Sequence, residues 1–358
     1  MESTGYITAA VQFGFILGTL VFAILAIADR YSPRLVFLSC ALLASLANSM
    51  LLVSPESLDY LLILRFITGF FLAGIYPVGM KIAAGWYQHG LGRALGYLVG
   101  ALVIGTAFPH LLRGLNIGLP WQQILISVSI LAASGGVLMA KFVPDGPFTA
   151  GMSQFNPAAL WQAFRLPSFR ASAFGYFGHM WELYSWWAFL PLWLVAYQQS
   201  TNTDINISMW CFLIIAAGML GSVIGGIFSQ KSGSAYVAML QLGISGICCL
   251  LSPVFFNFDV PVIFLFLLVW GITVVGDSPQ FSTLNAQNAP PAYIGSALTI
   301  VNSIGFLITI FSIQLLNSFW FAIGPQWVFL LLLPGPVFGL LSMRHFWKKT
   351  AKKTATPN

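Results

Sequence analysis

The chain of 358 residues has a net charge of +6, yet only 7% of its residues are charged and 58% are hydrophobic. Soluble domains have about 25% charged residues, so this composition excludes an ordinary soluble protein and predicts an all-α membrane protein with many spans. The positive charge does not indicate nucleic-acid binding, because five of the 15 basic residues lie between Arg344 and Lys353. The four cysteines lie in apolar segments without metal-ligand spacing, so we expect no metal and no cofactor.

Eleven apolar segments are long enough to cross a membrane. They cover residues 5–28, 35–54, 58–86, 93–114, 119–141, 171–198, 205–229, 234–256, 259–281, 292–318 and 321–346. One long connection separates the first five segments from the last six. The predicted organisation is an N-terminal helical bundle (1–141), a linker loop (142–170), a C-terminal helical bundle (171–347) and a basic tail (348–358).

The basic residues predict the orientation of these segments. Thirteen of the 15 lysines and arginines lie on the side of the membrane that the linker and the tail share. Because cytoplasmic loops carry an excess of lysine and arginine, we expect the linker and the C-terminus to be cytoplasmic. With eleven spans, the N-terminus is then expected on the outer side.

The two halves of the chain repeat each other. The motif Gly74-Ile-Tyr-Pro77 recurs 202 residues later as Gly276-Asp-Ser-Pro279, and Gly92-Arg-Ala-Leu95 recurs 203 residues later as Gly295-Ser-Ala-Leu298. Parallel repeats of this kind build known transporters. At this displacement the segment 171–198 has no counterpart in the first half, so we expect that half to lack its opening helix. Either the protein has eleven helices, or its true start lies upstream.

Two motifs resemble those of the major facilitator superfamily. The loop Asp29-Arg30-Tyr31-Ser32-Pro33-Arg34 resembles the first cytoplasmic signature of that family, although Leu25 stands where the family usually has Gly. Arg65 and Gly69 resemble the arginine motif of its fourth helix. The resemblance implies two pseudo-symmetric bundles, transport by alternating access, and a gating role for Asp29, Arg30 and Arg34. A third segment, Gly178–Tyr184, resembles a bacterial branch of the family, which implies a bacterial plasma membrane.

A glycine ladder and a buried arginine lie in the first half. Gly92, Gly96 and Gly100 are four residues apart, so they share one helix face and allow a neighbouring helix to approach closely. Arg65 lies inside an apolar segment, where a charge is costly and usually faces the bundle interior. It could bind an anionic solute, pair with Glu182 or Asp277 as a counter-charge, or bond a helix-terminal carbonyl.

The first segment of the second half carries the main candidate site. His179 and Glu182 are three residues apart and share a helix face, with Trp181 and Tyr184 beside them. Apolar surroundings disfavour a charged carboxyl group, which suits a role in proton coupling. The alternative is an interfacial aromatic belt with a structural His–Glu pair.

Other polar residues within the segments are secondary candidates. Asp277 precedes Pro279 and could contact solute or proton, or could only cap a helix at a turn. His110 lies near the predicted outer mouth. Asn302 and Gln314 could bind solute, but hydrogen bonds between helices are the more common use of such residues.

Three functions are compatible with the sequence. The leading hypothesis is a secondary active transporter of a small solute, coupled to protons and monomeric in the bilayer. The second is a non-transporting receptor or remnant of the same fold. The third is a membrane-embedded transferase, but no cluster of acid/base residues beyond His179 and Glu182 supports an enzyme. The sequence does not identify the solute.

Overall fold

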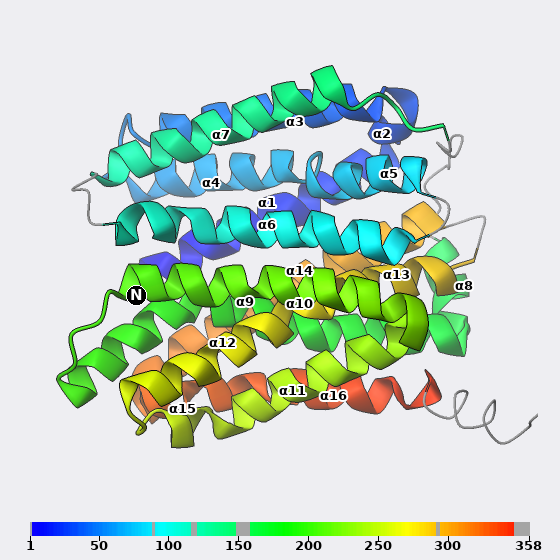
Figure 1. The fold of residues 1–358 in the computed structure, drawn as a ribbon. Helices are drawn as coiled ribbons and strands as arrows, with labels where there is room; N and C mark the ends of the chain where they lie inside the picture. Colours follow the sequence, from blue (N-terminus) through cyan, green and yellow to red (C-terminus); the bar gives the residue numbers. More distant parts are fainter. Residues whose placement is uncertain (1, 88–89, 116–119, 148–157, 291–293, 347–358) are drawn as a thin grey trace, which may run out of the picture.

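The computed structural model describes residues 2–87, 90–115, 120–147, 158–290 and 294–346. Within these ranges the regular secondary structure is entirely helical, as the sequence predicts. The helices form two groups, which Figure 1 shows one above the other, and each group corresponds to one half of the chain. The fold class predicted from the sequence is therefore confirmed.

The described residues of the N-terminal half form seven helices. They are α1 (Glu2–Ile24), α2 (Ile27–Arg30), α3 (Pro33–Met50), α4 (Leu58–Leu72), α5 (Tyr76–Trp86), α6 (Leu91–Gly114) and α7 (Trp121–Phe142). The predicted span 58–86 is thus two helices, because the backbone departs from regular helix between α4 and α5. Pro77 lies in the first turn of α5, where its missing N–H costs no helical hydrogen bond.

The C-terminal half contains the remaining elements. They are α8 (Ala158–Arg165), α9 (Pro167–Thr201), α10 (Ile207–Ser232), α11 (Ser234–Phe255), α12 (Val260–Gly276), α13 (Ser278–Asn288), α14 (Ile294–Ile323), α15 (Pro325–Val328), the 3₁₀ helix η2 (Phe329–Leu332) and α16 (Pro334–Ser342). The segment predicted to be a linker loop therefore contains α8 and the first turn of α9.

Ten stretches of the described chain are long and apolar enough to cross a membrane. The one predicted span that is not among them, 171–198, corresponds to α9, whose polar and aromatic residues lower its hydropathy. At about 1.5 Å per residue its 35 residues extend over about 52 Å, more than the ~30 Å hydrocarbon core. Because 20 of these residues are buried among other helices, α9 needs less apolar surface than a lipid-facing span.

The span that contains Asp277 differs from its prediction. The sequence predicts that this span ends at 281, but helix continues through α13 to Asn288 after a break at Asp277. The error arises because α13 is rich in serine, glutamine and asparagine, and such a sequence is typical of a loop. The breaks at α4–α5 and α12–α13 fall at the repeated motif, so they are equivalent positions in the two halves.

Two helix pairs form most of the contact between the two halves in the described residues. Helices α6 and α10 lie side by side in the middle of Figure 1 and pack along their length, while α1 packs against α14. The predicted glycine ladder faces α10: a Cβ added at Gly96 would lie 2.7 Å from the carbonyl oxygen of Ser222. Between α1 and α14, the hydroxyls of Thr19 and Ser303 are 2.9 Å apart. These contacts hold the bundles against each other.

Candidate functional site

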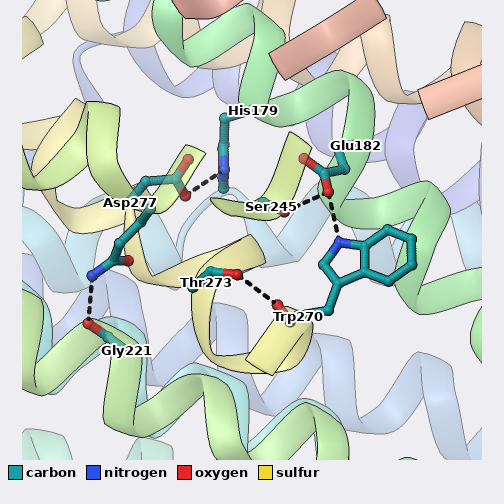
Figure 2. A network of polar contacts seen from close by, with 8 residues as sticks. His179, Glu182, Gly221, Ser245, Trp270, Thr273 and Asp277 are labelled. Carbon is teal, nitrogen blue, oxygen red and sulfur yellow. Dashed lines mark hydrogen bonds and ion pairs between the residues drawn. The ribbon is translucent and has the colours of Figure 1, made fainter. Parts of the chain in front are cut away.

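A histidine and an aspartate from different helices are in direct contact inside the C-terminal half. His179 lies on α9, and Asp277 lies at the break between α12 and α13. The Nδ1 atom of His179 is 2.7 Å from Oδ1 of Asp277, and both side chains are 1% exposed (Figure 2). The sequence predicted both residues as candidates but did not predict that they pair.

Glu182 lies one turn further along α9 and has its own set of partners (Figure 2). Its Oε1 atom accepts hydrogen bonds from Ser245 Oγ, from Cys249 Sγ at 3.2 Å and from Trp270 Nε1 at 2.8 Å. Ser245 and Cys249 belong to α11, and Trp270 belongs to α12. The carboxyl group of Glu182 therefore ties three helices together.

The partners of the two carboxyl groups in the described part of the chain are neutral groups and His179. Within the described residues, no lysine or arginine forms an ion pair with Glu182 or Asp277. A buried carboxylate without a paired cation is costly unless hydrogen bonds compensate it, and here hydroxyl, thiol, indole and imidazole groups surround the two acids. The Nδ1 atom of His179 is within hydrogen-bond distance of Oδ1 of Asp277, so the imidazole and the carboxyl group can share a proton. No group of residues that could hold a metal ion occurs in the described chain.

The aromatic candidates on α9 have structural partners. Trp181 donates from Nε1 to the carbonyl oxygen of Leu331 at 3.0 Å. The ring of Tyr184 packs edge-on against Trp187, with centroids 5.4 Å apart, and also contacts Phe306 of α14. Both Trp181 and Tyr184 are half-buried, so they lie at the edge of the buried core rather than in an exposed belt.

The described contacts of Arg65 are with residues other than His179, Glu182 and Asp277. Its Nη1 atom donates to Oδ1 of Asn48 on α3 at 3.1 Å. Asn48 in turn donates to Oγ of Ser129 on α7 at 2.9 Å. One of the alternatives for Arg65, a counter-charge contact with Glu182 or Asp277, does not occur among the described residues. Arg65 therefore belongs to a polar contact among α3, α4 and α7.

The predicted gating loop has one partner that the sequence did not reveal. Asp145, after α7, accepts a hydrogen bond from Oγ of Ser32 at 2.7 Å, and its Oδ2 atom is 3.9 Å from Nε of Arg34. Arg30 is exposed, and the side chain of Asp29 lies outside the described residues. The loop before α3 is thus joined to the segment that follows α7.

The remaining candidates occupy less central positions. His110 on α6, and Asn302 and Gln314 on α14, are all half-buried. A residue that the sequence did not single out, Tyr76 at the start of α5, lies near Ser278 and Ser282 of α13. Tyr76 and Ser278 are the equivalent residues of the repeated motif, so the two helix breaks meet between the halves.

The sequence did not predict several partners of the candidate residues, because these partners are distant in sequence. Trp270 lies 88 residues from Glu182, and nothing in its apolar segment marks it. Ser245 and Cys249 could have been found, because Gln241, Ser245 and Cys249 recur every four residues on one face of an apolar helix. This spacing places Ser245 and Cys249 on one face of α11, the face on which both contact Glu182 of α9.

Comparison with known proteins agrees with this architecture. The family model described as Major Facilitator Superfamily matches residues 2–313. The crystal structure of the human organic anion transporter MFSD10 (TETRAN) has a similar fold, with a TM-score of 0.68 and 18% sequence identity over 95% of this chain and 83% of that chain. No curated protein matches the sequence. The chain therefore belongs to the Major Facilitator Superfamily of membrane transporters.

Proposed function

We propose that this protein is a secondary active transporter that moves a small solute by alternating access and couples the movement to protons. The observation that supports this best is the buried contact between His179 and Asp277, 2.7 Å apart on separate helices. We further propose that the protein works as a monomer in a bacterial plasma membrane, with its C-terminus in the cytoplasm.

The position of the pair explains how a proton could drive a conformational change. His179 belongs to the long helix α9, whereas Asp277 lies at the break between α12 and α13. Adding or removing one proton changes the charge and the strength of the contact between these helices. Tyr76 of the N-terminal half lies near Ser278, the residue after Asp277. In this proposal, a shift at the break reaches the other half through Tyr76.

Glu182 supplies a second protonation site on the same helix. The three donors around its Oε1 atom fix its orientation, and Thr273 lies between Trp270 and Asp277 on α12 (Figure 2). In this proposal one carboxyl group carries the transported proton and the other senses it. Arg65, half-buried in the N-terminal half, is the candidate contact for a negatively charged solute.

The proposal is tested by uptake into liposomes that contain the purified protein. A screen for small solutes that raise the melting temperature first identifies a substrate. Uptake of that solute is then measured with and without an imposed pH gradient. Glu182→Gln and Asp277→Asn are expected to abolish accumulation driven by the pH gradient, because an amide side chain cannot bind and release a proton. Exchange of solute down its own gradient should continue, because the amide keeps the size of the carboxyl group.

A matched control separates the site from general loss of negative charge. Glu56→Gln changes an exposed acid in the connection before α4, and it should accumulate solute like the unaltered protein. Normal gradient-driven accumulation by both Glu182→Gln and Asp277→Asn would refute the proton-coupling role. A folded protein that moves none of the solutes it binds would instead support the receptor alternative.

A further inference from the structure

Helix α13 is unusual because it is polar and yet buried. Seven of its 11 residues are serine, threonine, asparagine or glutamine, whereas Thr273 is the one such residue in α12. The equivalent helix of the other half, α5, is almost entirely apolar. The low hydropathy of α13 does not explain its position in the interior of the protein. Its polar side chains need hydrogen-bond partners at that position.

Several of those side chains lack protein partners. Both the Oε1 and Nε2 atoms of Gln280 are without a hydrogen-bond partner among the described residues, although Gln280 is 0% exposed. The same holds for Oδ1 of Asn285, for Oδ2 of Asp277 and for Nε2 of His179. An unsatisfied buried polar group destabilises the fold, and buried water is a common way in which proteins satisfy such groups.

The polar side chains follow one face of α13 from the interior to the surface. Gln280, Thr283 and Gln287 stand at helical spacings of three and four residues, so they share a face. Their exposure rises along this face, from 0% at Gln280 and 4% at Thr283 to an exposed Gln287. Asp277 lies one turn before Gln280, at the buried end of the row.

The first turn of α6 and the end of α10 border this row. A Cβ added at Gly92 would lie 3.5 Å from both Oγ1 of Thr283 and Oγ of Ser229, so the two hydroxyl groups flank the same point. The next residue of α10, Gln230, is exposed and lies beside Gly90. The surroundings of Thr283 thus remain polar up to the protein surface.

We infer that the polar face of α13 lines a narrow water-filled passage, which carries protons between the His179–Asp277 pair and the surface at Gln287. Water molecules bound to Gln280 and Thr283 form the hydrogen-bonded chain along which a proton moves. This inference rests on the proposed proton coupling for its purpose, but the passage itself is tested without transport.

The test is the reaction of introduced cysteines with a water-soluble, positively charged methanethiosulfonate, followed by intact mass. Gln280→Cys and Thr283→Cys are expected to gain one adduct each, because the reagent reaches them through water. Val274→Cys is the matched control: it lies in the apolar half of the same broken span, is 1% exposed and should stay unmodified. The four native cysteines are free and buried, so the unaltered protein provides the background.

The labelling experiment shows whether the passage exists. If the cysteines at 280 and 283 react no faster than the one at 274, the passage does not exist. A second measurement uses Gln280→Leu, which replaces the amide with an apolar group of similar size and should slow gradient-driven uptake without slowing solute exchange. Uptake by Gln280→Leu at the normal rate, in a protein whose coupling Asp277→Asn abolishes, would overturn the inference and leave the proposed function intact.

Discussion

The indole Nε1 of Trp270 donates a hydrogen bond to Oε1 of Glu182 at 2.8 Å. The same indole ring packs against Trp186, with ring centroids 5.3 Å apart, so the donor is held in place by a neighbour of Glu182 on α9. Trp270 is 0% exposed and Glu182 is 1% exposed. The bond therefore fixes one orientation of a buried carboxyl group, whichever protonation state that group adopts.

Replacing Trp270 with Phe should destabilise the protein and disturb the orientation of Glu182. Phenylalanine retains much of the aromatic packing but lacks the N–H donor, so we expect a loss of about 1–2 kcal/mol in the free energy of unfolding. The control is Trp193→Phe, since Trp193 is equally buried and its Nε1 has no hydrogen-bond partner in the described structure. Thermal unfolding in detergent compares the two variants, and equal losses would show that the hydrogen bond contributes nothing.

The packing of the two halves gives a second prediction. Gly96 faces α10 so closely that an added Cβ would lie 2.7 Å from the backbone oxygen of Ser222, whereas a Cβ at Gly105 on the same helix would meet no atom within 4 Å. Gly96→Ala should therefore force α6 and α10 apart and cost about 1–3 kcal/mol. Gly105→Ala should be neutral or stabilising by up to about 1 kcal/mol, because alanine favours helix.

Melting temperatures of the two glycine variants, measured under the same conditions, check this prediction. Both changes add one methyl group to α6, so the comparison isolates the contact with α10. If Gly96→Ala melts at the same temperature as Gly105→Ala, the close approach of the two halves at this point is wrong.

The sequence predicted the helices and the halves because lipid exposure leaves a strong pattern in amino-acid choice. It also predicted the face of α6 that packs closely, since only glycine permits such an approach at Gly96. It could not show that Asp277 pairs with His179, because apolar periodicity says which residues avoid lipid but not which helices meet. The partners lie 98 residues apart, and their contact depends on how three helices pack.

Two other features show the same limit. The sequence predicts an end at residue 281, within α13, because the prediction assumes that segments buried in a membrane protein are apolar, and α13 is polar. Arg65 was correctly placed inside a span, yet its partner is Asn48, a neutral residue that a search for opposite charges passes over. The functional roles of both regions stay predictions.

The ion pair near the predicted gating loop should contribute little to stability. Arg34 and Asp145 are 3.9 Å apart, with side chains 39% and 36% exposed. Exposed pairs of this kind are worth about 0–1 kcal/mol, so Asp145→Ala should lower the free energy of unfolding by less than about 1 kcal/mol. A clear fall in solute flux by this variant, with its melting temperature unchanged, would support the gating role of Arg34; unchanged flux would count against it.

Variants of Arg65 and Asn48 test whether Arg65 only holds helices together or also binds the solute. Asn48 links α3 to α4 through Arg65 and to α7 through Ser129, so Asn48→Ala should cost about 1–3 kcal/mol.

If Arg65 acts only through Asn48, Arg65→Ala added to Asn48→Ala should cost far less than Arg65→Ala alone. The double-mutant cycle would then show a coupling of at least about 0.5 kcal/mol. Solute binding provides the second readout, because Asn48→Ala leaves the guanidinium charge in the protein. If Arg65→Ala abolishes binding of an anionic solute while Asn48→Ala spares it, Arg65 recognises the solute directly. If the two variants lose binding equally, Arg65 acts by holding α3 and α7 against α4.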